Sequence, residues 1–168
     1  PDETISMMDD VKIYDDFLND QELSDIIKFL NGAKWGMQRS NAHNKSHGSF
    51  LKLKVTEEEY FNSYLLNRVC DVIGSKHKLA TAYFNGQWFG QDGNFHTDGV
   101  PLSCLIYINQ YDPDWGGFTQ FKKSEREQFI VPPTQRRLVV FPGNITHKAY
   151  AYSRQTCPMR ISLAYKLI

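Results

Sequence analysis

Residues 159–168 read MRISLAYKLI, and this stretch indicates how the second half of the chain is built. Side chains of a strand point to opposite faces in turn, so its strict alternation predicts a strand with one face in a core. Arg160 on the other face is unusual, because a buried guanidinium is costly unless an anion pairs with it. An edge strand with this arginine in water is the alternative. The two alternating sets are Ile161, Leu163, Tyr165 and Leu167, and Arg160, Ser162, Ala164 and Lys166.

The chain before this strand carries similar signals back to residue 79. Short runs rich in β-branched and aromatic residues are separated by turn-forming pairs such as Asn85-Gly86 and Pro142-Gly143. About eight short strands after two helices are typical of a jelly-roll, or double-stranded β-helix. We therefore predict an α+β, mainly β fold in which N-terminal helices support a barrel with one open mouth. The expected strands are 79–84, 96–98, 102–109, 118–122, 128–131, 137–141, 145–152 and 159–167.

Two helices are expected before these strands, after a short strand at 11–14. The first spans 19–32, and Asn19 with Glu22 can form a capping box at its start. The second spans 56–74, with Thr56 and Glu59 in the same arrangement. Between them, residues 36–49 are polar and lack periodicity, which predicts a long loop.

Composition fits one soluble domain spanning residues 1–168, since 41% of the residues are hydrophobic and 23% are charged. The nineteen basic and nineteen acidic residues cancel, so net charge favours neither a nucleic-acid nor a membrane partner. Three separated cysteines, Cys70, Cys104 and Cys157, favour free thiols in a reducing compartment. With no apolar run of membrane-spanning length and no leader sequence, we expect a cytoplasmic protein.

Residues 90–98, GQDGNFHTD, contain the clearest chemical signal. In an extended strand, His96 and Asp98 point the same way. One imidazole and one carboxylate are two of the three ligands that bind non-haem Fe(II) on one face and leave positions open. His147, in the distant stretch PGNITHKA, is the candidate third ligand. An ordinary surface or core-edge pair at 96 and 98 is the alternative.

Taken in order along the chain, four motifs resemble the Fe(II)/2-oxoglutarate-dependent dioxygenases, and in detail their prolyl-hydroxylase branch. The motifs are His96-x-Asp98, Gly116-Gly117-Phe118-Thr119, Phe141-Pro142 with His147, and Arg160-x-Ser162. The resemblance covers essentially the whole chain. It implies that His96, Asp98 and His147 bind iron and that Arg160 binds the C5 carboxylate of 2-oxoglutarate. It also implies that Ser162 or Tyr107 assists Arg160, and that Tyr83 belongs to the same pocket.

The resemblance also implies a reaction. An unactivated C–H bond would be hydroxylated while 2-oxoglutarate is converted to succinate and CO2, with a prolyl or similar residue of a peptide or protein as the expected acceptor. The implied cofactors are Fe(II), 2-oxoglutarate and O2, with ascorbate as a further candidate. The alternatives are a nucleic-acid or small-molecule oxygenase of the same kind, and a non-catalytic jelly-roll that binds a metal or a small acid. Lys166 stands where nucleic-acid demethylases of this kind have a second arginine.

Two parts of the site are not assigned uniquely by the sequence: the arginine that binds the co-substrate and the residues that contact the substrate. Arg160 follows His147 by thirteen residues, which is longer than in the closest prolyl-hydroxylase pattern, so Arg154 is a rival for the co-substrate. Three residues are candidates for substrate contact. Trp115 and Trp88 flank the expected mouth, and Arg39 lies in the polar loop, which resembles a lid that folds over peptide substrates.

Overall fold

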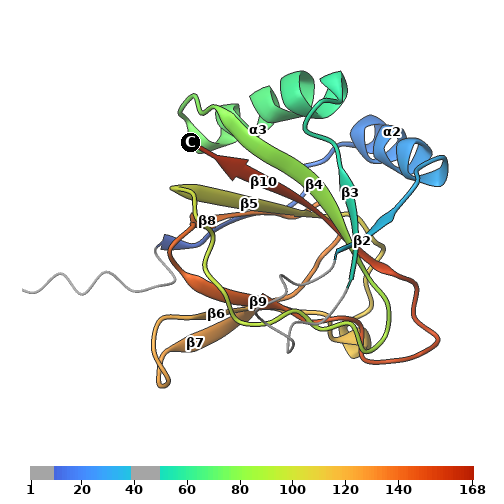
Figure 1. The fold of residues 1–168 in the computed structure, drawn as a ribbon, viewed down its shortest axis with the longest axis vertical. Helices are drawn as coiled ribbons and strands as arrows, with labels where there is room; N and C mark the ends of the chain where they lie inside the picture. Colours follow the sequence, from blue (N-terminus) through green and yellow to red (C-terminus); the bar gives the residue numbers. More distant parts are fainter. Residues whose placement is uncertain (1–9, 39–49) are drawn as a thin grey trace, which may run out of the picture.

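A computed structural model describes residues 10–38 and 50–168, and Figure 1 shows two facing sheets with helices outside one of them. In this part of the chain the larger sheet has seven strands in the order β1-β8-β5-β10-β4-β3-β2, and the smaller has three in the order β7-β6-β9. Neighbouring strands are antiparallel. The strands of the larger sheet are β1 (Lys12–Tyr14), β2 (Gly36–Gln38), β3 (Phe50–Lys54), β4 (Leu79–Gln87), β5 (Leu102–Tyr107), β8 (Leu138–Pro142) and β10 (Arg160–Leu167); those of the smaller are β6 (Thr119–Lys122), β7 (Gln128–Val131) and β9 (Thr146–Ala149).

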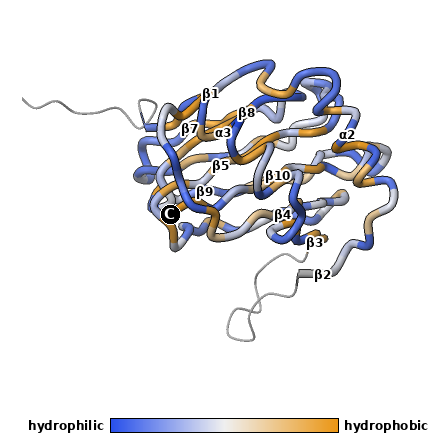
Figure 2. Tube along the Cα trace, turned by 90° about the horizontal axis from the view of Figure 1, so that it is seen from above, coloured by the Kyte–Doolittle hydropathy of each residue, from blue (hydrophilic) through white to orange (hydrophobic). Residues whose placement is uncertain are grey.

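Two hydrophobic layers flank the larger sheet and explain the alternation in β10. The outer layer packs the sheet against the helices, and the inner layer packs it against the smaller sheet. Figure 2 shows hydrophobic residues concentrated along β5 and β8, which contribute to both layers. The predicted division of β10 is confirmed, because Leu163 and Tyr165 lie in the outer layer and Ala164 lies in the inner one. The predicted mainly-β barrel with supporting N-terminal helices is therefore correct.

Helix α2 (Asp20–Asn31) begins as the sequence predicts. The Asn19 side chain accepts from the backbone N–H of Glu22 at 2.8 Å, and the Glu22 carboxylate accepts from the backbone N–H of Asn19 at 2.9 Å. These two bonds satisfy amides that the first turn of a helix would otherwise leave unpaired. The apolar stripe of the helix, including Leu23 and Ile26, is buried against the larger sheet.

The second helical segment begins later than predicted. It consists of a π-helical turn, η1 (Tyr60–Leu65), followed by α3 (Leu66–Ile73), and it ends at Gly74 with φ of 81°. The capping box expected at Thr56 is wrong. The Thr56 hydroxyl instead accepts from the backbone N–H of Ala82 at 3.0 Å and pairs with the Thr81 hydroxyl at 3.1 Å. This side chain therefore joins the start of the helical segment to β4.

Three other expectations need correction. Asn85-Gly86 does not form a turn, because β4 continues through it; a Cβ on Gly86 would lie 2.7 Å from the sulfur of Met159, so a glycine fits this close packing. The segment expected to be a loop, 36–49, begins with strand β2, which pairs with the unpredicted strand β3. The rest of the segment, 39–49, lies outside the described residues. The expected strand at 96–98 is reduced to one bridge, between His96 and His147, which continues the smaller sheet beyond β9.

None of the helices in the described ranges is long and apolar enough to cross a membrane.

Candidate metal centre and anion pocket

Three side chains from two distant parts of the chain meet at the barrel mouth. His96 and Asp98 come from the segment that precedes β5, and His147 comes from β9. One ligand atom from each lies within 4.8 Å of the others. Asp98 is central, since its Oδ1 lies 3.7 Å from Nε2 of His96 and its Oδ2 lies 3.5 Å from Nε2 of His147. Two imidazoles and a carboxylate so arranged are the donor set of a facial metal site with open positions.

Backbone carbonyls fix the direction of both imidazole rings. Nδ1 of His96 lies 2.8 Å from the carbonyl oxygen of Asn94, and Nδ1 of His147 lies 2.9 Å from that of Ile145. Because a carbonyl can only accept, each Nδ1 carries the proton and each Nε2 keeps its lone pair. The two nitrogens that face Asp98 are therefore the ones that can bind a metal, as is usual for histidine ligands.

The two histidines differ in exposure. The His96 side chain is 49% exposed and that of His147 is 6% exposed. The buried ring packs against Phe121, Phe141 and His96. Burial lowers the pKa of His147 to about 4, so its imidazole is neutral near pH 7 and ready to act as a ligand. The cluster therefore opens toward solvent on the His96 side.

Lys166 and Ser103 both bind the Asp98 carboxylate. The Ser103 hydroxyl donates to Oδ2 of Asp98 at 2.6 Å, and the Lys166 ammonium forms an ion pair with the same oxygen. These two residues are direct cross-strand partners on β5 and β10, and both are buried. Burial raises the pKa of Asp98, but the Lys166 ammonium and the Ser103 hydroxyl outweigh it, so the pKa lies below its ordinary value. Asp98 is thus ionised and oriented.

Removing the ammonium of Lys166 is expected to destabilise the metal-free protein more than the metal-bound protein. Lys166→Met leaves the buried Asp98 carboxylate without its cation, which costs roughly 3 kcal/mol in the metal-free protein and lowers Tm on the order of 10 °C. Mn(II) replaces the missing charge, so its addition should raise Tm more in this variant than in wild type. Thermal unfolding with and without Mn(II) measures both effects, with the exposed Lys12→Met as control. An equal Tm loss with and without metal would contradict this role.

A glycine allows the two ligand-bearing segments to approach each other. The Gly143 carbonyl accepts from the backbone N–H of Asp98 at 2.7 Å, and its own N–H donates to the Pro101 carbonyl at 3.1 Å. A Cβ at this position would lie 1.9 Å from the carbonyl oxygen of Val100 and 3.2 Å from that of Asp98. Backbone atoms cannot rotate out of the way, so a side chain here must displace the segment that carries Asp98.

Gly143→Ala is therefore expected to weaken metal binding as well as stability. Overpacking of this kind costs about 1–3 kcal/mol, and the shift of Asp98 should lower Mn(II) affinity roughly tenfold. Calorimetric titration and thermal unfolding measure the two effects. Gly99→Ala is the matched control on the same segment, because a Cβ there meets nothing within 4 Å. If both variants bind Mn(II) equally well, the close approach at Gly143 does not position the ligand.

Arg160 lies at the bottom of the barrel, fully surrounded by neutral groups. It is 1% exposed, and it donates to the Gly117 carbonyl at 2.8 Å, to Oε1 of Gln87 at 2.9 Å and to the Thr119 hydroxyl at 3.3 Å. Among residues 10–38 and 50–168 no carboxylate lies within 4 Å of it. A buried guanidinium without a nearby acid is costly, and its planar fork suits an anion that binds in a bidentate manner.

Two tyrosines pack beside this arginine. The guanidinium carbon lies 5.4 Å from the ring centroid of Tyr107, whose hydroxyl pairs with the Thr119 hydroxyl at 2.7 Å. The buried hydroxyl of Tyr152 has no hydrogen-bond partner in the described part of the chain. Its ring packs against Gly117, where a Cβ would be 2.5 Å from Cδ1 of Tyr152, and φ of 71° also favours glycine.

The pocket and the metal cluster share one barrel wall. On strand β6, Thr119 contacts the guanidinium, and Phe121, two residues further, is the cross-strand partner of His147. Two residues of a strand span about 7 Å.

The structure distinguishes the remaining predicted site residues. Ser162 is buried on the inner face of β10, and Arg154, the rival for the co-substrate, is exposed. Tyr83 also lines the inner layer. Trp115 is half-buried against Tyr152, and Trp88 is 50% exposed, so neither contacts the cluster through an observed interaction. Arg39 lies outside the described residues.

Sequence reasoning missed Gln87, Ser103, Thr119 and Tyr152, and it did not identify Lys166 as the partner of Asp98. Thr119 falls in the quoted Gly-Gly-Phe-Thr motif, and Lys166 shares the alternating face of Arg160, so both had a signal in the sequence. Gln87 and Ser103 are ordinary polar residues in strands, and only the register of the sheet identifies them.

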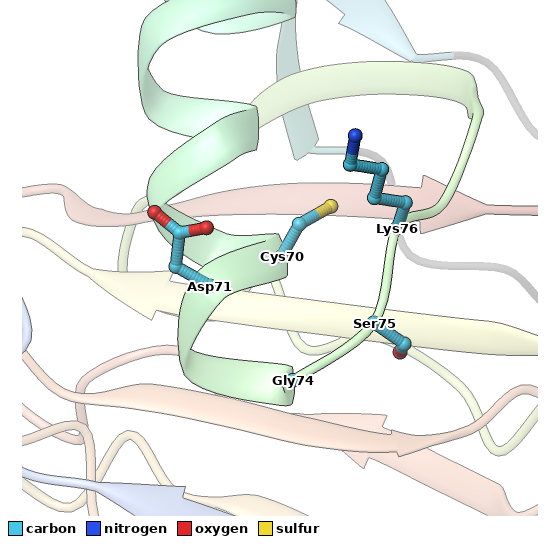
Figure 3. Close-up of a pocket in the computed structure, with 5 residues that line it drawn as sticks. All are labelled: Cys70, Asp71, Gly74, Ser75 and Lys76. Carbon is cyan, nitrogen blue, oxygen red and sulfur yellow. The ribbon is translucent and has the colours of Figure 1, made fainter.

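A separate hollow lies at the end of α3, outside the larger sheet. Figure 3 shows it lined by Cys70, Asp71, Gly74, Ser75 and Lys76, with the cysteine and lysine side chains on one side and the aspartate turned away. It shares no residue with the metal cluster or the Arg160 pocket. A single buried thiol beside exposed polar groups gives no specific chemistry, so we assign it no function.

The architecture matches solved structures of known enzymes. An oxidoreductase of the 2OG-Fe(II) oxygenase family from Burkholderia pseudomallei has a TM-score of 0.75 at 12% identity, covering 94% of this chain and 84% of that one. A prolyl hydroxylase from Trichoplax adhaerens, in complex with a peptide fragment of the hypoxia inducible factor oxygen degradation domain, has a TM-score of 0.73 at 15% identity, covering 95% and 83%. SnoN, a non-heme alpha ketoglutarate dependent epimerase from nogalamycin biosynthesis, has a TM-score of 0.68 at 12% identity, covering 94% and 76%.

At the level of sequence, no family model matches the chain, and no curated protein matches it. The structural likenesses establish the fold alone, and the chain has the double-stranded β-helix fold of these enzymes.

Proposed function

We propose that the chain is an oxygenase that uses Fe(II) and 2-oxoglutarate to hydroxylate an unactivated C–H bond. One observation carries the proposal: a buried guanidinium, with no carboxylate within 4 Å among the described residues, contacts Thr119 of β6, and Phe121 of the same strand lies opposite His147 of the cluster of two imidazoles and a carboxylate. A dicarboxylic co-substrate would supply the missing anion and reach the metal ligands. The fold supports the proposal, because all three compared structures have names that refer to 2-oxoglutarate or to hydroxylation.

The residues present fit both groups. His96, Asp98 and His147 would hold Fe(II) through Nε2, a carboxylate oxygen and Nε2. Arg160 would hold the distal carboxylate of 2-oxoglutarate. When bound, iron and its co-substrate would use O2 to oxidise the acceptor C–H bond, with one oxygen atom going to succinate and the other to the new hydroxyl, and with release of CO2.

The chain itself contributes orientation and exclusion of water. Lys166 and Ser103 keep Asp98 ionised and oriented, and backbone carbonyls keep both imidazoles in the metal-binding tautomer. Phe121 and Phe141 enclose His147, so solvent reaches the cluster mainly beside His96. An acceptor entering on that side would exclude the remaining water.

For the acceptor we propose a prolyl or similar residue of a peptide or protein, as the motif order suggests. The prolyl hydroxylase among the compared structures binds a peptide, which supports this assignment. SnoN shares the fold and is an epimerase, so the fold alone does not determine the acceptor. A nucleic-acid acceptor is less well supported because the chain has no net charge.

The test is succinate formation by the purified chain. With Fe(II), 2-oxoglutarate and ascorbate in air we expect slow succinate release without acceptor, and none under anaerobic conditions or with Zn(II) in place of Fe(II). Mass spectrometry of a peptide pool should then find acceptors that gain one oxygen atom. Absence of succinate, together with absence of any Mn(II)-dependent binding of 2-oxoglutarate, would favour the non-catalytic alternative.

A further inference from the structure

Two lysines extend the lining of the barrel beyond the metal cluster. In the antiparallel pair of β3 and β4, Lys52 lies opposite Asn85 and Lys54 lies opposite Tyr83. Opposite residues of an antiparallel pair point to the same face. Asn85 is in turn opposite Ser162, one of the residues on the inner face of β10. Both lysines therefore belong to the face that lines the barrel, at the edge where β3 extends the larger sheet.

Lys52 lies on the barrel face that also carries Lys166, the ion-pair partner of Asp98. Its ammonium lies 3.7 Å from the ring centroid of Tyr83, a cation–π contact that fixes the direction of the long side chain. Tyr83 is the cross-strand partner of Ala164 on β10, and Lys166 follows two residues later on the same face of that strand. A group bound at Lys52 would therefore lie on the same inner face as a group bound beside Asp98.

Among the described residues the positive charge at this edge has no counterion. No carboxylate of the described ranges lies within 4 Å of Lys52 or Lys54. Asp98 is already paired with Lys166. Burial lowers the pKa of Lys52, and the ammonium groups of Lys166 and Lys54 lower it further. An anion between them would relieve this repulsion.

A buried amide oxygen without a partner in the described chain, Oδ1 of Asn85, belongs to the residue opposite Lys52. A buried acceptor of this kind costs free energy until a donor reaches it. A peptide offers both missing partners, because a backbone N–H can donate to Asn85 while an acidic group accepts from Lys52.

On the premise of the proposed function, we infer that the acceptor carries a carboxylate in addition to the carbon that is oxidised, and that Lys52 binds this carboxylate. Asn85 accepts an N–H from the same molecule. The carboxylate can belong to an acidic residue flanking the target in a peptide, or to a free amino acid. The chemistry at Lys52 is the same in both cases, and the choice between them is made by experiment.

The experiment is an affinity selection. The whole chain, loaded anaerobically with Mn(II) and 2-oxoglutarate, is incubated with a randomised library of peptides of the form X-X-Pro-X-X, and bound peptides are sequenced by mass spectrometry. We expect members with Asp or Glu within two residues of proline to be enriched at least tenfold over their Asn and Gln counterparts. Competition by free L-proline but not by its amide would instead identify the free amino acid as the source of the carboxylate.

Variants test whether Lys52 causes the preference for acidic peptides. Lys52→Met should remove the enrichment, Lys52→Arg should retain it, and the exposed Lys12→Met should behave as wild type. The inference is overturned by equal recovery of acidic and amide peptides without competition by L-proline, or by an oligonucleotide that competes better than any acidic peptide. Failure of the proposed function looks different, because the wild-type chain would then show no Mn(II)-dependent binding of 2-oxoglutarate at all.

Discussion

Arg160→Met is expected to raise the concentration of 2-oxoglutarate required for half-saturation about 100-fold. The guanidinium is buried and has no carboxylate within 4 Å in the described ranges, so a bound carboxylate would be paired with it away from water. Truncating one partner of such a pair costs several kcal/mol, and about 3 kcal/mol corresponds to roughly two orders of magnitude in affinity. Calorimetric titration of the Mn(II)-loaded protein with 2-oxoglutarate measures the change directly.

Two further variants make this prediction specific. Arg160→Lys keeps the charge but loses the planar fork that donates to Gly117 and Gln87, so an intermediate loss is expected. Arg154→Met is the matched control, because this exposed arginine is the rival in the sequence. If Arg154→Met weakens 2-oxoglutarate binding more than Arg160→Met does, the pocket described here is not the co-substrate site.

Features encoded by local patterns were predictable from the sequence. The alternation in residues 159–168 predicts both the strand and its two faces. Successive side chains of a strand point to opposite faces of the sheet, so every second residue belongs to the same face. The capping box at Asn19 is a contact between residues three apart, and it forms as expected. The meeting of His96, Asp98 and His147 was predicted as well, from the resemblance of four ordered motifs.

Features that depend on distant partners were not predictable. Thr56 has the spacing of a helix cap, but its hydroxyl finds a better partner in β4, which only the folded sheet brings near. Asn85-Gly86 is typical of a turn, yet Gly86 pairs with Ile161 of β10 and with Leu51 of β3, so it remains in a strand. The ion pair between Lys166 and Asp98 depends on strand register, which the sequence of either segment does not contain. In each case a tertiary contact overrides a local preference.

Asp98→Asn is expected to lower Mn(II) affinity at least 100-fold. This carboxylate is the only anionic ligand of the cluster, and a neutral amide binds a hard divalent cation much more weakly. The amide can still accept from Ser103 and Lys166, so its shape and part of its hydrogen bonding survive, but the Lys166 ammonium loses its buried counterion. The metal-free protein should therefore be less stable, and Mn(II) should restore little of the lost Tm.

The metal titration needs a control for the change from acid to amide and a second ligand for comparison. Asp71→Asn changes an exposed carboxylate near the end of α3, outside the cluster, and should leave Mn(II) affinity unchanged. His147→Ala removes a ligand without changing charge, because its low pKa keeps the imidazole neutral near pH 7, and it should cause a loss of similar size. If Asp98→Asn or His147→Ala binds Mn(II) as tightly as Asp71→Asn, the three side chains do not form a metal site. Since the co-substrate is expected to bind to both the metal and Arg160, these variants should also lose metal-dependent binding of 2-oxoglutarate.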